Sequence, residues 1–221
     1  MTGGSHRVTP PRRRDARRNW DLLVGAAREV FAEQGLEAPL DVIARRAGVG
    51  NATLYRNFPT RAALVDAAFH DLLTGTMAAG EQARTAPDAW AALNEYLRAV
   101  FVTLAADRGT NDLMTTRLEG VEALRAVHAH NRETMDVLLG RGRDQGTVRA
   151  DVTTEDVLFA LAALGRAIPA LSTATTPDAW RRPLALFLDG LRAAPAAPPL
   201  PGAALTADQL DRSLHELGRK P

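Results

Sequence analysis

The sequence of 221 residues predicts an all-α fold, in which three N-terminal helices precede a larger helical domain. Apolar residues recur along most of the chain at the i, i+3, i+4 and i+7 spacing of helices that bury one face. Glycine and proline separate these segments, and no stretch alternates apolar and polar residues as a half-buried strand does. We therefore expect a disordered arm at 1–14, a first domain at 15–62, a second domain at 63–194 and a Pro/Ala-rich tail at 195–221.

The arm and the first helix differ in composition. Residues 1–14 contain paired glycines, paired prolines and three consecutive arginines with almost nothing apolar, which is typical of disorder. A helix is predicted from about Asp15 to Gln34, and Gly35 ends it. Its apolar stripe consists of Trp20, Leu23, Ala27, Val30 and Phe31.

Two short helices joined by a tight turn are predicted within Leu40–Phe58. The first has an apolar face made of Leu40, Ile43, Ala44 and Ala47. Gly48 follows and can take the left-handed conformation that reverses the chain. The second helix starts near Asn51 and ends before Pro59, with Leu54 and Phe58 as its buried pair. This is the helix-turn-helix arrangement, whose second helix enters the major groove of DNA, so we expect residues 15–62 to bind DNA.

The charge distribution agrees with this expectation but does not decide it. Residues 1–61 hold 11 Arg and 6 Asp or Glu, a net charge of +5, whereas residues 62–221 have a net charge of −4. A basic end suits a molecule that meets phosphates, although a window of this size drifts as far by chance. The basic arm either reaches a minor groove, as homeodomain arms do, or is a solubilising tail.

The second domain is predicted to be helical throughout. Its first helix begins after Thr60, a good N-cap, and is expected to loosen between Met77 and Ala86. Pro169 is expected to kink the end of a later helix. We expect a turn at 107–111 and a loop at 140–146. Further helices are predicted at 87–104, 113–118, 121–139, 154–172 and 177–193, with a short amphipathic helix at 205–217.

Three motifs in the first domain are more specific than a generic helix-turn-helix. They read Ala26-Ala27-x-x-Val30-Phe31-x-x-x-Gly35, then Ile43-Ala44-x-x-Ala47-Gly48-Val49, then Thr53-Leu54-Tyr55-x-x-Phe58-Pro59-x-Arg61-x-x-Leu64. Over residues 20–70 the chain resembles the DNA-binding domain of the tetracycline-repressor (TetR) family. The resemblance implies an all-helical homodimer that represses transcription and leaves its double-stranded DNA operator when a small-molecule effector binds. It also implies that the second domain binds the ligand and dimerises.

The resemblance also implies roles for individual residues. Asn51 and Ala52 match positions that meet base edges, where Asn bonds adenine and Ala touches a thymine methyl group. The other matches are to phosphate-binding positions, and these are Thr53, Tyr55, Asn57 and Arg61.

Two of these roles have alternatives, and two positions depart from the family pattern. Asn51 can instead cap its helix, and Tyr55 can pack between helices. Pro39, acceptable as a first helical residue, stands where the family often has a hydroxyl, and Gly50 replaces a common serine.

The helices at 154–172 and 177–193 are apolar over more than one stripe. Ala162 and Gly165 lie one turn apart and would let another helix come close. A second apolar face needs a second partner, which a four-helix bundle made by two subunits supplies. The alternative is that both helices are central to a single-chain core. Because the resembling family dimerises through its last two large helices, we expect the dimer.

The ligand site is less clearly marked. His128 and Asn131 lie close to an apolar line, and buried polar groups need partners, which a ligand supplies. A satisfied core histidine or a boundary residue explains each of them as well. Apolar cavities are lined by similar residue types, and the further candidates are Trp90, Phe101, Met114, Arg117 and Phe159. His128 and His130 diverge on a helix, so no metal site or cofactor is expected.

Other function classes are disfavoured. The chain has no cysteine, hence no thiolate site or disulfide, and no phosphate loop, nucleophile elbow or metal spacing typical of enzymes. No apolar run approaches the ~20 residues of a membrane span, and the start lacks the apolar region of a secretory signal. We expect a cytoplasmic, non-enzymatic regulator without a membrane partner. The alternative is a constitutive DNA-binding or scaffolding dimer that responds to no ligand.

Overall fold

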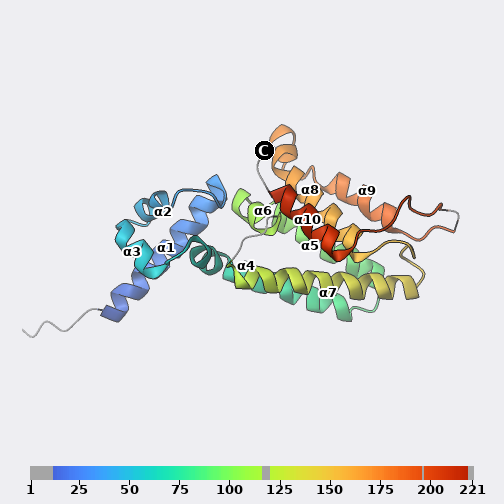
Figure 1. The fold of residues 1–221 in the computed structure, drawn as a ribbon, viewed down its shortest axis with the longest axis horizontal. Coiled ribbons are helices and arrows are strands. Elements are labelled where there is room, and N and C mark those ends of the chain that lie inside the picture. Colours follow the sequence, from blue (N-terminus) through green and yellow to red (C-terminus); the bar gives the residue numbers. More distant parts are fainter. Residues whose placement is uncertain (1–11, 116–119, 196, 219–221) are drawn as a thin grey trace, which may run out of the picture.

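The computed structural model describes residues 12–115, 120–195 and 197–218 and confirms the all-α fold. Within these residues there is no strand, and one isolated β-bridge joins Val148 to Arg192. The molecule is elongated, with α1–α3 at one end and the remaining helices at the other (Figure 1). The helices are α1 (Arg12–Gln34), α2 (Leu40–Arg46), α3 (Asn51–Asn57), α4 (Arg61–Thr85), α5 (Ala89–Leu104), α6 (Arg108–Thr115), α7 (Glu122–Asp144), α8 (Thr154–Ala174), α9 (Arg181–Leu191) and α10 (Ala207–Gly218).

The helix-turn-helix forms as its sequence predicts. After α2, the N–H of Gly48 donates to the carbonyl of Arg45, and the N–H of Val49 donates to that of Ala44. This Schellman pattern needs a left-handed residue, and Gly48 has a φ of 68°. Leu54 and Phe58 are buried in the same core as Phe31.

Helix α1 begins earlier than predicted. Residues 12–14, expected in the arm, belong to its first turn, and residues 1–11 of the arm lie outside the described residues. The predicted stripe is buried except for Trp20, whose side chain is 40% exposed and lies 6.0 Å from the ring of Phe58. Pro39 is the N-cap of α2 rather than its first helical residue.

The expected loosening between Met77 and Ala86 is wrong, because α4 is continuous from Arg61 to Thr85. Thr60 caps its start by accepting a hydrogen bond from the N–H of Ala63 (3.1 Å). Gly80, expected to weaken the helix, is buried where α4 packs along α7. Glycine lowers the local stability of α4, but at position 80 its missing side chain leaves the space that α7 occupies.

Two further boundaries also differ. The predicted turn at 107–111 is mostly α6, because the carboxylate of Asp107 accepts from both the N–H and the hydroxyl of Thr110 at its start. The predicted loop at 140–146 is mostly α7, which continues to Asp144. A Cβ atom at Gly142 would lie 2.4 Å from Val148, so this glycine serves packing rather than a break. Residues 116–118 of the predicted helix at 113–118 lie outside the described residues.

Helix α8 starts as predicted, with a capping box between Thr153 and Asp156. Pro169 lies inside the helix, which continues to Ala174. Helix α9 starts later than expected, at Arg181. Gly165 is close to the side chains of Leu104 and Thr115 of its own chain (3.1 Å from an added Cβ), so its close approach does not serve a second subunit.

Helix α8 is more apolar than the sequence analysis expected, but it does not overturn the expectation of a protein without a membrane partner. Among the described helices it alone is long and apolar enough to cross one, with a mean hydropathy of 1.6 over 18 residues. Core helices of soluble proteins meet the same criterion, so one such helix is weak support for a membrane span. However, only 17% of this window is buried inside the chain. Most residues of α8 therefore remain at least partly accessible within the chain.

The buried residues form two clusters. One joins α1–α3 to the first part of α4 and includes Leu124 and Val127 of α7. The other lies among α5, α7, α8 and α9. Met114 on α6 packs against both. Helices α4, α6 and α7 therefore connect the two ends of the molecule.

Candidate nucleic-acid interface

The outward face of α3 is polar and accessible. Asn51, Ala52, Tyr55 and Arg56 are exposed, and the opposite face buries Leu54. Residues spaced three and four apart share one side of a helix, so these four side chains form one surface. The face has the residue types that contact base edges and phosphates.

The geometry bears on the two alternatives for α3. Gly50 occupies the N-cap position, and Asn51 is the first helical residue. No hydrogen bond of the Asn51 amide is formed within the described residues, so this amide does not cap the helix. The side chain of Tyr55 is 54% exposed and therefore does not pack between helices.

Thr53 and Asn57 lie at the edge of this face. Both are half-buried, and the Asn57 amide donates to the Thr53 carbonyl at 2.7 Å. This bond orients the Asn57 amide along the helix, while its oxygen remains available as an acceptor.

Arg61 has an internal role that the sequence did not indicate. Its Nη1 donates to the carbonyls of Leu36 and Ala38 at 2.6 and 2.7 Å. These bonds fasten the start of α4 to the loop between α1 and α2. The guanidinium has five N–H donors, so a phosphate contact from its other nitrogens is compatible with this geometry.

Arg56 is a candidate contact that the sequence motifs did not single out. It is exposed on α3, next to Tyr55 and one helical turn after Ala52. The i, i+4 spacing from Ala52 could have placed it on the same face. It adds a positive charge to a surface that otherwise offers neutral polar groups.

A charged cluster fixes the angle between α1 and α2. Both terminal nitrogens of Arg46 bind Glu33 (3.1 and 3.0 Å), and Nη1 also binds Glu29 (3.1 Å). These bonds and the positive charge of Arg46 hold the pKa of Glu33 below its usual value. The cluster is exposed and screened, so it contributes orientation more than stability.

Helix α6 joins the DNA-binding end to the helical domain. A Cβ atom at Gly109 would lie 2.7 Å from the backbone carbon and oxygen of Phe31, so α6 meets α1 at backbone distance. The carboxylate of Asp112 accepts from the N–H of Leu36 at 3.2 Å. The backbone turn after α1 is therefore hydrogen-bonded directly to α6.

The other side of α6 is bonded to α8. Pro169 has no N–H to donate to the carbonyl of Gly165, four residues earlier. The Asn111 amide donates to that carbonyl instead (2.9 Å), and also to the carbonyl of Leu104 (2.9 Å). Asn111 is buried, so these bonds tie α6 firmly to α5 and α8.

Helix α4 makes the second connection, along α7. His130 of α7 lies against Gly80 of α4, and the buried Nε2 atom of His130 has no hydrogen bond to any of the described residues. At the end of α4, Arg141 of α7 donates to the carbonyls of Arg84 (2.7 Å) and Ala86. Movement of α7 must therefore move α4 or break these contacts.

Comparisons with known proteins agree with the geometry of α1–α3. The family model for bacterial regulatory proteins of the tetR family matches residues 23–68, and the model for the SbtR-like transcriptional regulator C-terminal domain matches residues 86–193. Among solved structures, the TetR transcriptional regulator SCO0520 from Streptomyces coelicolor is 31% identical, with a TM-score of 0.53. The match covers 79% of this chain and 99% of that one. The chain belongs to the TetR family.

More distant structures share the fold. SmeT, the repressor of a Stenotrophomonas maltophilia multidrug efflux pump, is 20% identical, with a TM-score of 0.54 over 82% of this chain and 97% of that one. FadR from Bacillus subtilis, solved with stearoyl-CoA, is 18% identical, with a TM-score of 0.59 over 78% and 99%. The search of curated proteins found no match. As a TetR-family member, the chain is a DNA-binding transcription regulator and not an enzyme.

The ligand candidates in this TetR-family chain occupy different surroundings. Phe101 is fully buried, with its ring 5.9 Å from that of Trp180, whereas Phe159 is 36% exposed on α8. The guanidinium of Arg192 lies over the ring of Trp90, 4.7 Å from the ring centre. Met114 and His128 are half-buried, and Arg117 lies outside the described residues.

Asn131 is the candidate with a defined polar partner. Its Oδ1 accepts a hydrogen bond from the hydroxyl of Tyr96 at 2.7 Å. Burial raises the pKa of Tyr96 to about 12. A groove of about 620 Å³ lies elsewhere, between α1 and α4 beside Trp20, and none of the ligand candidates lines it. The six described candidates therefore lie in differing surroundings, and none of them lines this groove.

Proposed function

We propose that this regulator is a repressor that binds a palindromic operator as a homodimer and is released by a small, largely apolar ligand. The exposed face of α3 supports operator binding. Asn51 and Ala52 would read base edges, and Thr53, Tyr55, Asn57 and Arg61 would hold phosphates, with Arg56 as an additional phosphate contact. Because the protein acts on DNA, we place it in the cytoplasm.

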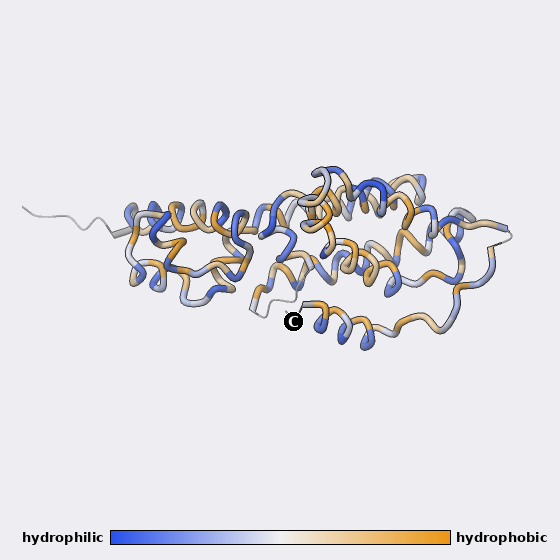
Figure 2. The backbone as a smooth tube through the Cα atoms, turned by 90° about the horizontal axis from the view of Figure 1, so that it is seen from above, coloured by the Kyte–Doolittle hydropathy of each residue, from blue (hydrophilic) through white to orange (hydrophobic). Residues whose placement is uncertain are grey.

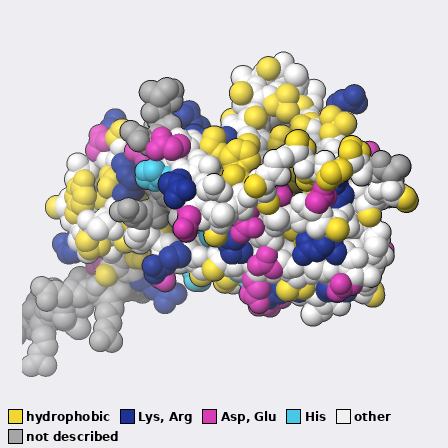
Figure 3. Space-filling view, turned by 45° about the vertical axis from the view of Figure 1, so that its right-hand side comes forward, with side chains coloured by type: hydrophobic (Ala, Val, Ile, Leu, Met, Phe, Trp, Pro, Cys, Tyr) yellow, Lys and Arg dark blue, Asp and Glu magenta, His cyan; other side chains and the backbone are white. Residues whose placement is uncertain are grey.

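The open apolar surface of α8 and α9 supports the dimer. Phe159 on α8 is 36% exposed and Leu186 on α9 is 66% exposed. Figure 3 shows hydrophobic side chains gathered along the upper edge of the helical domain, where α8 and α9 lie in Figure 1. A contiguous apolar patch on a soluble protein marks an interaction site. A second copy would cover the same surface on both subunits, as two-fold symmetry requires.

Dimerisation sets the spacing of the two recognition helices. Major-groove half-sites on one face of DNA recur at about 34–36 Å. A change of a few ångströms between the two α3 helices weakens contacts at both half-sites together. The dimer interface and the α3 face therefore act as one unit in operator binding.

Ligand release would use the two connections to α1–α3. A ligand among α5, α7 and α8 would displace α7 against Gly80 of α4, or α6 against Phe31 of α1. The seven ligand candidates remain proposals, and Asn131 and His128 are the polar ones on the described part of α7. By linkage, a ligand that weakens operator binding tenfold must bind the DNA complex tenfold more weakly, a coupling of about 1.4 kcal/mol.

The decisive experiment measures operator binding with and without ligands. Duplexes selected from a random pool should contain two related half-sites. Compounds that raise the melting temperature of the free protein should then be enriched among those that release the selected duplex. Tight binders that leave operator affinity unchanged would replace this proposal with a constitutive DNA-binding dimer.

A further inference from the structure

The C-terminal residues 194, 195 and 197–218, here called the strap, lie beyond the part of the chain that the family's C-terminal domain matches, which ends at residue 193. After α9 the chain turns back along the helical domain and ends in α10, which packs against α8 (Figure 1). The strap is therefore an addition to the family domain with a definite place in the fold.

Backbone bonds fix the point where the strap leaves α9. The N–H of Ala193 donates to the carbonyl of Thr147, and the N–H of Arg149 donates to that of Leu191, both at 3.0 Å. Together with the bridge between Val148 and Arg192, they pair the end of α9 with the loop between α7 and α8. The strap thus starts from a fixed position.

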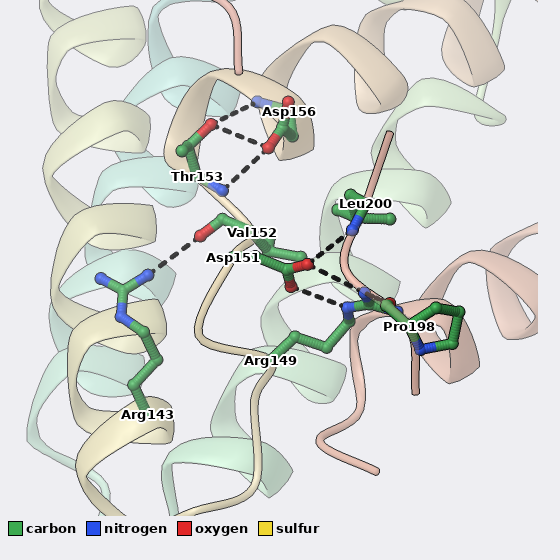
Figure 4. A network of polar contacts seen from close by, with 8 residues as sticks. All are labelled: Arg143, Arg149, Asp151, Val152, Thr153, Asp156, Pro198 and Leu200. Atoms are coloured by element: carbon green, nitrogen blue, oxygen red, sulfur yellow. Dashed lines mark hydrogen bonds and ion pairs between the residues drawn. The ribbon is translucent and has the colours of Figure 1, made fainter. Parts of the chain in front are cut away.

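An ion pair in the same loop holds the middle of the strap (Figure 4). Arg149 binds Asp151 through two nitrogens, at 2.9 and 3.0 Å. Arg149 Nη2 also donates to the carbonyl of Pro198 at 2.8 Å, and Asp151 Oδ2 accepts from the N–H of Leu200 at 2.8 Å. The bonds from Arg149 and then from Leu200 hold the pKa of Asp151 well below its usual range. Arg149 and Asp151, here called the clamp, hydrogen-bond to the two residues of the strap that flank Pro199.

The end of the strap is a well-formed amphipathic helix. Thr206 and Gln209 make a capping box at the start of α10, with side-chain to backbone bonds of 2.8 and 3.3 Å. Leu210 is 1% exposed, and Leu214 and Leu217 are half-buried. The other face is polar, and Figure 2 shows its hydrophilic residues on the side away from the bundle. Its exposed residues are Asp208, Gln209, Arg212, His215 and Glu216.

Helix α8 has more apolar surface than its own core covers. Its inner side buries Val157 and Ile168 among α5, α7 and α9. The same helix also contacts α10, and Phe159 on it is 36% exposed. Where α10 covers α8, the molecule exposes the polar outer face of α10 instead of apolar side chains of α8. Another molecule cannot bind the covered apolar side chains.

We infer that the strap is an intrachain cover for one side of α8, fastened by the clamp of Arg149 and Asp151, and that it restricts self-association to the side left open. The occupant of the covered side is α10 of the same chain. The clamp fixes residues 198–200 in place, so only residues 201–206 separate the fixed point from α10. This short tether keeps the effective concentration of α10 at its own α8 high.

Hydrogen exchange of the full chain tests the cover. Leu210→Asp places a carboxylate against the apolar side of α8, and Asp151→Asn removes one arm of the clamp. We expect each variant to exchange roughly tenfold faster or more in peptides from 198–217 and from α8, because each removes a buried or charge-assisted interaction. Peptides of α1–α3 should be unchanged. Asp178→Asn is the control, because it removes a similar but exposed pair with Arg181.

Sedimentation and binding of an apolar fluorescent dye measure the consequence. Leu210→Asp should bind more dye and form species larger than those of the unmutated chain at the same concentration. Unchanged dye binding or an unchanged mass distribution would overturn the inference, as would α8 protection that rises with protein concentration, because α10 would then come from a second copy. Neither readout involves operator or effector. An unmutated monomer would contradict the proposed dimer and leave this test in force.

Discussion

Gly80 of α4 lies directly against His130 of α7. A Cβ atom built on Gly80 would be 2.3 Å from His130 Nε2 and 2.8 Å from Thr134 Oγ1. The imidazole occupies the space that any other residue at position 80 would need. Helix α4 runs from the DNA-binding end into the helical domain. The distance between α4 and α7 at this contact therefore affects both ends of the molecule.

The first prediction is that Gly80→Ala destabilises the protein by about 1–3 kcal/mol, the usual cost of overpacking a tight contact. Adding His130→Ala should restore part of that stability by clearing the nearest atom. Gly75→Ala, on the same helix but with open space around it, should instead stabilise by about 0.5–1 kcal/mol. Chemical unfolding of the three variants measures these signs. Equal effects at positions 75 and 80 would contradict the close contact.

The second prediction concerns Gly109 on α6. Its neighbour is the backbone of Phe31, which cannot move aside as a side chain can. Gly109→Ala should therefore separate α6 from α1, lower the free energy of unfolding by about 1–3 kcal/mol and speed hydrogen exchange around Phe31. Gly140→Ala on α7, which has free space, is the matched control. Normal exchange around Phe31 in the Gly109 variant would show that α6 does not support α1.

The third prediction separates base reading from phosphate binding on α3. Asn51→Ala should weaken operator binding by about 1–3 kcal/mol per half-site and relax the preference at one base pair. Arg56→Ala should weaken binding to all duplexes alike and reduce the salt slope by about one unit for each phosphate that the variant no longer binds. Titrations of operator variants at several salt concentrations distinguish the two. A sequence-selective weakening by Arg56→Ala would exchange the assignments.

The fourth prediction concerns the dimer. Leu184 is 2% exposed within its own chain, so a charge there would unfold the subunit, whereas Leu186 is 66% exposed. Leu186→Glu should therefore leave each subunit folded and shift the association equilibrium toward monomer, because a carboxylate would be buried in the interface. Sedimentation combined with circular dichroism measures both. A folded dimer of unchanged affinity would place the interface elsewhere.

The fifth prediction concerns Tyr96. Burial raises the pKa of its phenol to about 12. The unfolded chain ionises this phenol from about pH 10, while the folded chain keeps it neutral. The free energy of unfolding should therefore be unaffected below pH 10 and fall by about 2–3 kcal/mol as the pH rises to 12. Tyr96→Phe should lack this fall. The other tyrosine, Tyr55, is exposed. Parallel profiles for the two proteins would show that Tyr96 is not held neutral.

The helix-turn-helix could be predicted from the sequence because its determinants are local. Gly48 supplies the left-handed residue of the turn, and Leu54 and Phe58 are one helical turn apart on α3. The bonds that close the turn join residues no more than five positions apart. The capping residue Thr60 was recognisable for the same reason.

The errors occurred where a distant partner overrides a local preference. Gly80, Gly140 and Gly142 looked like helix breaks, since glycine costs a helix about 1 kcal/mol. In the fold all three lie inside α4 or α7, and at Gly80 and Gly142 the missing side chain makes room for His130 and Val148. No local pattern contains those neighbours.

For the polar residues Arg61 and Asn111, too, the residue type was a local signal, whereas the bonding partner depends on the fold. Their residue types indicated hydrogen bonding, and for Arg61 the family motif indicated a phosphate. Only the fold brings the carbonyls of Leu36 and Ala38 to Arg61, and the carbonyl that Pro169 leaves free to Asn111. The sequence by itself determined the fold class, the turn and the exposed face of α3. Tertiary structure decided which helices continue and which polar groups are already bonded, because those outcomes depend on contacts between residues far apart in the chain.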